Sequence, residues 1–291
     1  GPGITNTITP FRAEGSESLL DLSGLREIRG ILGTPGLIGK ASLHRIEAIN
    51  GGTIDLRNLE TIDIRNASVD ESTLTIDATS GAISFDSLRT LQMSTSWPQG
   101  IHVKFGTGDA SLPSLISAPK VTFEKNGIGT LTLGSPTSGD LSMVGSRISA
   151  SAGAIVDASG LTDFTFGTVE LTGNGSTFLA PNIEVIDGSR LVLREGAVFE
   201  LAANPTTPNG DFTYTAFFPA VHNQFHPSRT PTIIGSGADT LVDLHRLIQV
   251  SVELGSSGLL GKGLFGEISA LNGGVIDLSG LEYLDASPTG G

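Results

Sequence analysis

The chain has 291 residues, of which 38% are hydrophobic, 16% are charged and 39 are glycine, and its formal net charge is −13. This acidity argues against a nucleic-acid partner and against docking on anionic membranes, because both need a concentrated positive field. Cysteine is absent, which excludes a disulfide framework, a thiolate zinc site and a cysteine nucleophile. No apolar run approaches the roughly eighteen residues of a transmembrane helix, so we expect no membrane insertion.

Residues 1–15 precede the first patterned segment. They begin with Gly-Pro-Gly and no Met, which is typical of the remnant left when a purification tag is cleaved. We therefore expect a tag remnant and an N-terminal lead-in at 1–15. We also expect the chain to be excised from a larger protein, without that protein's signal and anchor segments.

An internal repeat runs through the rest of the chain. The segment NGGTIDLRNLETIDI at 50–64 returns as NGGVIDLSGLEYLDA at 272–286, and such self-similarity is the signature of a repeat architecture. The repeat has eight clear copies, and the gaps between Leu115 and Leu161 and between Ile183 and Leu247 are wide enough for one more each. Degenerate copies around Leu141 and at GAVFELAAN would raise the count to about ten. The eight clearer copies share an aliphatic residue at Leu25, Leu59, Leu88, Leu115, Leu161, Ile183, Leu247 and Leu281.

Each copy alternates aliphatic and polar residues. In TIDL, the aliphatic Ile54 and Leu56 flank Asp55, which is the period-two pattern of a strand with one buried face. No segment of the chain shows a clean helical period. One unit is therefore predicted to be three short strands joined by turns, over 51–57, 59–65 and 72–78.

A single unit cannot bury its aliphatic face alone, so the units must stack. Stacking predicts an all-β fold, a right-handed parallel β-helix of about ten coils, as one domain over 16–287 with a tail at 288–291. Ile54 then lies between Leu20 and Ile83, and the glycine before the strand supplies the positive φ of a tight corner. Leucine-rich repeats are disfavoured because the period is irregular and the Asn that follows their strand is missing.

The stacked GGxIDLxxL units, the richness in Gly, Ser, Thr and Asn, the acidity and the lack of Cys resemble the β-helical segments of bacterial surface and secreted proteins. Adhesins and autotransporter passenger domains are the familiar examples. The resemblance covers nearly the whole chain, from about residue 15 to 287. It implies an extended, surface-exposed and usually non-catalytic solenoid, although some members of this group are polysaccharide lyases or hydrolases.

The outward residue of the repeat is often Asp, at positions 21, 55, 157, 243 and 277. Aligned carboxylates can bind Ca²⁺, which prefers oxygen ligands; the alternative is a solvated surface or a turn-capping role. Asp21 and Asp55 fall in consecutive copies of the repeat, and so do Asp243 and Asp277. These four aspartates are therefore the candidates for a calcium site. No other cofactor is expected.

Residues 204–231 interrupt the repeat with NPTTPNGDFTYTAFFPAVHNQFHPSRTP. The chain is only 5% aromatic, so this concentration predicts a projecting aromatic and Pro-rich insertion. Its rings can form a platform on which sugars stack, or they can pack over the solenoid flank. The candidate ligand-binding residues are Phe212, Tyr214, Phe217, Phe218, His222, Phe225 and His226, together with the single Trp97 in STSWPQGIHVKF, for which packing is again the alternative.

The sequence contains no Gly-x-Ser-x-Gly elbow, no Walker loop and no His-Glu-x-x-His pair. We therefore expect a non-catalytic structural or adhesive module that binds a glycan or a surface protein. We expect it to be extracellular or on the cell surface, and monomeric or joined to further coils in the full-length protein. The runner-up is a β-helical polysaccharide lyase or glycoside hydrolase, whose paired carboxylates the sequence does not single out. Ice binding would need a regular Thr-x-Thr array, and the ragged period disfavours it.

Overall fold

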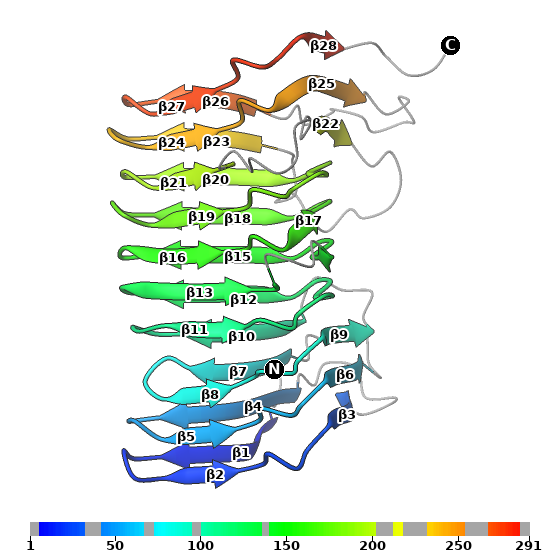
Figure 1. The fold of residues 1–291 in the computed structure, drawn as a ribbon, viewed down its shortest axis with the longest axis vertical. Helices are drawn as coiled ribbons and strands as arrows, with labels where there is room; N and C mark the ends of the chain where they lie inside the picture. Colours follow the sequence, from blue (N-terminus) through cyan, green and yellow to red (C-terminus); the bar gives the residue numbers. More distant parts are fainter. Residues whose placement is uncertain are drawn as a thin grey trace, which may run out of the picture.

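The computed structural model describes residues 6–32, 42–66, 73–94, 100–135, 140–201, 212–217, 232–253 and 267–285. These residues form strands and turns, and the strands stack in parallel as ten coils (Figure 1). The predicted all-β parallel β-helix is confirmed, and a right-handed sense is the one that nearly all parallel crossovers adopt. Within this described part of the chain, no helix is long and apolar enough to cross a bilayer.

The first face of the solenoid is one ten-stranded sheet, with one strand from each coil; coils are numbered from the N-terminus by these strands. Its first strand begins at Asn6, so the ladder includes residues that the sequence analysis assigned to a lead-in. The strands are β1 (Asn6–Glu14), β4 (Ser42–Ile49), β7 (Thr73–Ala78), β10 (Ile101–Phe105), β12 (Thr122–Asn126), β15 (Arg147–Ser151), β18 (Thr168–Thr172), β20 (Arg190–Arg194), β23 (Thr232–Ser236) and β26 (Glu267–Leu271).

The second face carries the short strands of the repeat motif and divides into two sheets, one of three strands and one of seven. The smaller sheet belongs to coils 1 to 3 and the larger to coils 4 to 10. The strands are β2 (Leu19–Asp21), β5 (Thr53–Asp55) and β8 (Ala82–Ser84), then β11 (Ala110–Leu112), β13 (Gly129–Leu133), β16 (Ala154–Asp157), β19 (Thr177–Leu179), β21 (Val198–Glu200), β24 (Leu241–Asp243) and β27 (Val275–Asp277).

The third face is narrowest in the middle of the stack, where coils 4 and 7 contribute only single-residue bridges at Ser117 and Val185. Leu141 pairs with Leu161 here, which confirms the degenerate copy predicted around Leu141. The strands are β3 (Glu27–Leu32), β6 (Thr61–Asn66), β9 (Thr90–Ser94), β14 (Leu141–Ser142), β17 (Leu161–Asp163), β22 (Phe212–Phe217), β25 (Leu247–Glu253) and β28 (Tyr283–Asp285).

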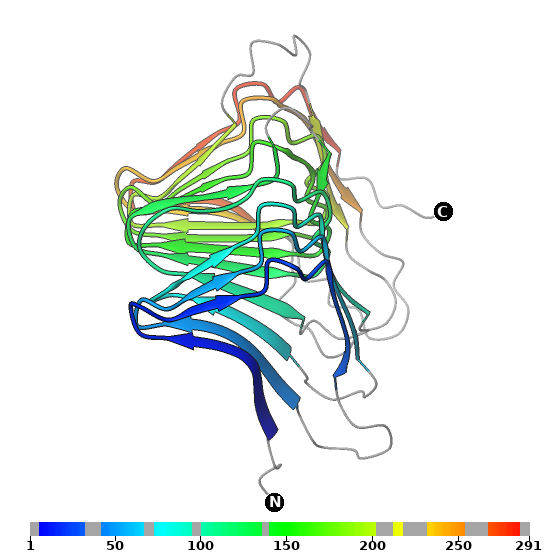
Figure 2. The same cartoon turned by 60° about the horizontal axis from the view of Figure 1, so that its bottom comes forward.

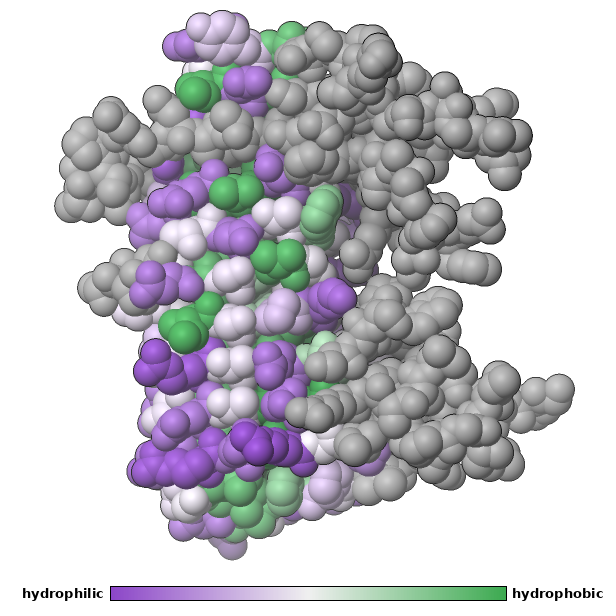
Figure 3. All heavy atoms as spheres, turned by 90° about the vertical axis from the view of Figure 1, so that its right-hand side faces the viewer, coloured by the Kyte–Doolittle hydropathy of each residue, from purple (hydrophilic) through white to green (hydrophobic). Residues whose placement is uncertain are grey.

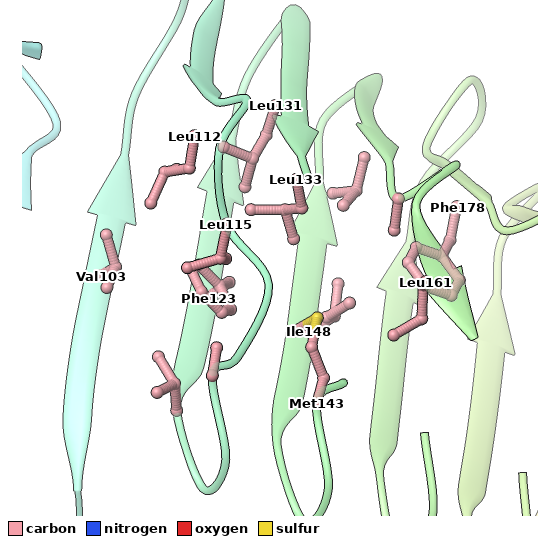
Figure 4. Close-up of a cluster of buried hydrophobic side chains, with 14 of the residues drawn as sticks. Val103, Leu112, Leu115, Phe123, Leu131, Leu133, Met143, Ile148, Leu161 and Phe178 are labelled. Carbon is pink, nitrogen blue, oxygen red and sulfur yellow. The ribbon is translucent and has the colours of Figure 1, made fainter. Parts of the chain in front are cut away.

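In-register pairing aligns the inward side chains of successive coils into apolar columns. Ile54 pairs with Leu20 below and Ile83 above, as predicted. Figure 4 shows such side chains from neighbouring coils pointing into the space that the faces enclose. Phe178 lies between two other rings, with centroids 6.2 Å from Phe164 and 5.4 Å from Phe199. The core is therefore continuous along the stack.

One charged residue interrupts these columns. Lys125 lies in register between Phe105 and Ala150 and is fully buried. Its Nζ donates to the carbonyl oxygens of Gly106 (2.5 Å) and Gly127 (3.0 Å), at the corner between the first and second faces. Burial lowers the pKa of this amine. The lysine stem fills the core while its head satisfies corner carbonyls, as amphipathic side chains do.

Figure 2 shows the chain turning from the first face to the second in each coil. This corner takes two forms, which alternate over coils 1 and 2 and over coils 6 to 10. Coils 2, 6, 8 and 10 have a glycine corner, in which two consecutive residues adopt positive φ: Asn50–Gly51, Ala152–Gly153, Glu195–Gly196 and Asn272–Gly273. Coils 1, 7 and 9 have a hydroxyl corner, in which a positive-φ glycine is followed three residues later by Ser or Thr: Gly15/Ser18, Gly173/Ser176 and Gly237/Thr240.

The two corner forms hydrogen-bond to each other across neighbouring coils. Where a hydroxyl corner lies above a glycine corner, its oxygen accepts the glycine N–H: Gly153 N–H to Ser176 Oγ at 3.2 Å and Gly196 N–H to Thr240 Oγ1 at 2.9 Å. Each hydroxyl also donates to a carbonyl of its own coil, at Glu14, Thr172 and Ser236. In coils 6 and 8 the glycine corner is therefore completed by the hydroxyl corner above it, whereas in coil 2 the Gly51 N–H donates to the Ser80 carbonyl at 2.6 Å.

The glycine directly before the strand has a different role from the one predicted. Gly51 adopts the positive φ of 82°, whereas Gly52, which precedes β5, does not have a positive φ. A Cβ on Gly52 would lie 2.4 Å from the carbonyl oxygen of Ala13 in the coil below. Gly52 is therefore required for close approach of two coils, and the expectation about its φ is wrong.

Gly52→Ala should accordingly lower the free energy of unfolding by about 1–3 kcal/mol, because the backbone of coil 1 must move to admit the methyl group. The measurement is the urea midpoint followed by circular dichroism. Gly24→Ala is the matched control, since a Cβ there meets nothing within 4 Å. Equal midpoints for the two variants would contradict this role.

Phe178→Ala should destabilise the fold by roughly 3–5 kcal/mol, because it removes the middle ring of the stack and leaves a cavity. The same urea experiment measures it. Ile128→Ala serves as the control, since Ile128 is 76% exposed and a surface substitution of this kind changes stability by only about 0.5 kcal/mol.

Candidate functional site

The aspartates of the second face close the strands on which they lie. Each carboxylate accepts the backbone N–H two residues further on, which is an Asx turn. The five N–H···Oδ1 distances lie between 2.9 and 3.1 Å, from Ser23 to Asp21, Arg57 to Asp55, Ser159 to Asp157, His245 to Asp243 and Ser279 to Asp277. These side chains therefore turn the chain toward the third face.

Asp55 has the most developed environment of the five. It is buried, and the Arg57 guanidinium donates to both carboxylate oxygens, with Nε at 3.0 Å from Oδ1 and 2.8 Å from Oδ2. These bonds lower the pKa of Asp55 and raise that of Arg57. Hydrogen bonds from Ser23 and Ser279 lower the pKa of the exposed Asp21 and the half-buried Asp277 in the same way.

The calcium hypothesis rests on stacked carboxylates, and the structure does align two pairs. Asp21 lies in register with Asp55, and Asp243 with Asp277. Asp157 instead lies between Thr132 and Leu179, as the sequence indicates. Over the described ranges, no group of three or more His, Cys, Asp or Glu side chains is placed to hold a metal ion. Calcium binding by these two pairs stays a prediction.

A cation near either pair would compete with groups already present. The Arg57 guanidinium occupies both oxygens of Asp55, and His245 Nδ1 lies 2.6 Å from Asp243 Oδ1. Carboxylates that already cap turns and pair with side chains have few lone pairs left for a metal ion. The geometry therefore favours the turn-capping alternative for the aspartates.

The aromatic candidates are only partly within the described residues. Phe212, Tyr214 and Phe217 belong to β22, which pairs in parallel with β25 on the third face. This part of the predicted insertion is a strand of coil 8 and does not project from the solenoid. The remaining candidates, Phe218, His222, Phe225, His226 and Trp97, lie outside the described residues.

The outer face of the ten-stranded sheet carries a ladder of charged and hydroxyl side chains that the sequence analysis missed. Threonine alternates with basic residues along one outward column, which runs Arg45, Thr75, His102, Thr122, Arg147, Thr168, Arg190 and Thr232. The neighbouring column over coils 2 to 9 has acidic residues at four of its eight positions, Glu47, Asp77, Glu124 and Glu170, and Lys104, Ser149, Val192 and Ile234 at the others. We call these two columns the polar ladder.

Acids and bases of the polar ladder pair with one another. Glu170 accepts from Arg147 of the coil below and Arg190 of the coil above, at 2.5 and 3.0 Å. The other two pairs are Arg45–Glu47 at 2.9 Å and Lys104–Glu124 at 3.4 Å. Such pairs contribute little to stability individually, about 0.2–1 kcal/mol. They do hold the charged groups of this face in fixed positions.

His102 lies in the middle of the polar ladder. Its burial lowers the pKa of the imidazole, and the nearby Lys104 lowers it further. The ring is therefore neutral at neutral pH and offers one donor and one acceptor. In the sequence, this face is indicated by charged residues at every second position of LHRIEAI, IHVKF and TVELT. These strands precede the GGxIDLxxL motif by which the copies of the repeat are recognised.

One side of the stack can be seen in Figure 3. Among the described residues, hydrophilic and hydrophobic side chains alternate in small groups along its height.

Asp55→Asn tests the contribution of the capped carboxylate. Because the pKa of Asp55 is lower in the folded chain, its charged form stabilises the fold above the ordinary pKa of 3.8. That stabilisation is lost as pH falls through the lower folded value. Asp55→Asn should lower the urea midpoint at pH 7 and weaken its fall below pH 3.8. Arg57→Gln should do the same, and an unchanged acid dependence in both variants would contradict the assignment.

Comparison of the chain with protein-family models, with curated proteins and with solved structures found no match.

Proposed function

We propose that this chain is a non-catalytic structural and adhesive module of a bacterial cell-surface or secreted protein, which binds a glycan or another protein through its outer faces. The observation that carries the proposal is the polar ladder on the ten-stranded sheet. The resemblance in repeat style and composition to the β-helical segments of adhesins and autotransporter passengers supports the same function.

The arrangement of titratable groups favours binding over catalysis. General acid–base chemistry needs an acid and a base that converge on one point. In the polar ladder, Glu47, Glu124 and Glu170 are instead bonded to arginine or lysine side chains of their own or adjacent coils, and Asp77 accepts from Thr79. The aspartates of the second face are committed to turns.

The same ladder suits a long, polar ligand. Its donors and acceptors recur at about the 4.8 Å spacing of neighbouring strands, on a sheet that spans all ten coils. A rigid backbone ladder holds these groups in place before the ligand arrives, which reduces the entropy lost on binding. An extended polysaccharide or an extended segment of another protein can contact several coils at once.

A glycan array combined with a reducing-sugar release assay tests this proposal. We expect binding to one class of polysaccharide without release of reducing ends. Arg147→Ser should weaken that binding by about tenfold, because it removes charge-assisted hydrogen bonds from the centre of the ladder. Arg89→Ser is the control, since Arg89 is exposed outside the ladder.

Two results would contradict the proposal. Release of reducing sugars that His102→Ala or Glu124→Gln abolishes would support the polysaccharide-degrading alternative. Binding that is equally weakened by Arg147→Ser and Arg89→Ser would remove the polar ladder from the binding surface.

A further inference from the structure

The two ends of the described stack are apolar and unpaired. The strands of coils 1 and 10 have a neighbour on one side only. At the coil 10 end, Ile268 and Leu284 are 42% and 69% exposed, whereas Ile233 and Val250 at the same positions of coil 9 are buried. Edges of this kind are templates for pairing with another chain.

We propose that the coil 10 end docks on the coil 1 end of a second copy of this chain, in register, so that copies associate head to tail. The interface is heterologous, with different surfaces on its two sides, and such contacts produce open filaments when rotation does not close them. Three independent features of the two ends support this assignment.

The first feature is the corner chemistry. Coil 10 ends in the glycine corner Asn272–Gly273, with φ values of 52° and 86°, and no acceptor for the Gly273 N–H is found among the described residues. In coils 6 and 8 the equivalent N–H groups of Gly153 and Gly196 bond to hydroxyls of the next coil. In coil 2 the Gly51 N–H instead donates to the backbone carbonyl of Ser80 in the next coil, at 2.6 Å. A coil above coil 10 can therefore supply the Gly273 N–H with an acceptor, and a hydroxyl corner does so at two of the three comparable corners.

Coil 1 presents that hydroxyl corner. Ser18 Oγ donates to the Glu14 carbonyl at 2.5 Å, as Ser176 and Thr240 do to the carbonyls four residues before them. Ser176 and Thr240 are buried against the glycine corner of the coil below, whereas Ser18, which has no described coil below it, is only partly buried. Docking places Ser18 of the second copy against the Gly273 N–H and continues the alternation of corners.

The second feature is the match of the apolar columns. The inward positions of coil 1 are partly buried aliphatic or aromatic residues, as are those of coil 10 on the second face. If the in-register pairing of the chain continues across the interface, each inward residue of coil 1 of the second copy lies above an apolar residue of coil 10. The pairs, with the coil 10 residue first, are Ile268 and Phe11, Ala270 and Ala13, Ile276 and Leu20, Leu278 and Leu22, Leu281 and Leu25, and Leu284 and Ile28.

The third feature is one charge pair. Coil 10 over 267–285 has four acidic and no basic residues, and coil 1 over 6–32 has three arginines and four acids. Arg12 and Arg29 pair with Glu14 and Glu27 of their own coil, which leaves Arg26 as the arginine that can meet coil 10. Glu282 and Arg26 each follow the shared leucine of their coils, so docking stacks one over the other. The chain already makes this contact internally, where Arg26 pairs with Glu60, the equivalent of Glu282, at 2.9 Å.

Two positions of the interface are less favourable and limit its strength. Asp277 lies over Asp21, although the chain already tolerates the same stacking between Asp21 and Asp55. Pro10 lacks an N–H and lies opposite Glu267, which leaves Phe11–Glu14 to pair with the rest of β26. An edge strand accepts proline at such a position.

Sedimentation velocity over a concentration series tests the docking. The wild-type chain should form a concentration-dependent series of oligomers, with each added copy lengthening the rod by about 48 Å for ten coils at ~4.8 Å. Ile268→Lys should abolish association, because it places a charge in the apolar column at the free end. Ile155→Lys is the matched control, since Ile155 is 36% exposed on the outward side of coil 6, and this variant should associate normally.

A charge exchange keeps the test decisive if Ile268→Lys fails to fold. Arg26→Glu alone and Glu282→Arg alone each place like charges across the interface, and each should weaken association by about tenfold. An equimolar mixture of the two variants contains only opposite-charge contacts when copies alternate, so mixing should restore association. A chain that stays monomeric at every concentration would overturn the proposal. Normal association of the Ile268→Lys variant would overturn it as well. So would a mixture of Arg26→Glu and Glu282→Arg that associates no better than either variant alone.

Discussion

Parallel hydrogen bonding between successive coils is the interaction on which the rest of this structure depends. A coil consists of three short strands that have no independent core, and it becomes stable only when a neighbour covers its apolar interior. In-register pairing then fixes which residues of successive coils share a column. A shift of one residue would exchange the inward and outward columns along a whole face. The apolar pattern of the sequence therefore enforces the register.

The register that builds the core also arranges the outer surface. Because Arg147, Glu170 and Arg190 come from three consecutive coils, stacking alone brings their charges together. The polar ladder is thus a consequence of core packing, and its composition is free to vary without disturbing the interior. Corners, by contrast, involve backbone atoms of two coils at once, which leaves room for few residue types, as Gly52 shows.

The sequence predicted those parts of the fold that the interior constrains. Period-two alternation and the shared leucine were enough for the fold class, the number of coils and the neighbours of Ile54. Features without an inward signature were missed. Pro10 and the irregular register between Ile8 and Phe11 interrupt the alternation of β1. The buried Lys125 breaks the apolar pattern of its column, so the sequence does not mark it as inward. β22 lies in a segment whose composition indicates an insertion. The polar ladder was missed because its strands precede the motif used for alignment.

The alternation of glycine and hydroxyl corners bears on how such a chain can change length. Removal of one coil between coils 6 and 10 would bring two corners of the same form together, so that a glycine N–H would lose its hydroxyl acceptor or two hydroxyls would face each other. Removal of two adjacent coils would leave every remaining contact matched. In this half of the protein the unit of duplication or loss that preserves the structure is consequently a pair of coils, about twice the length of the repeat visible in the sequence.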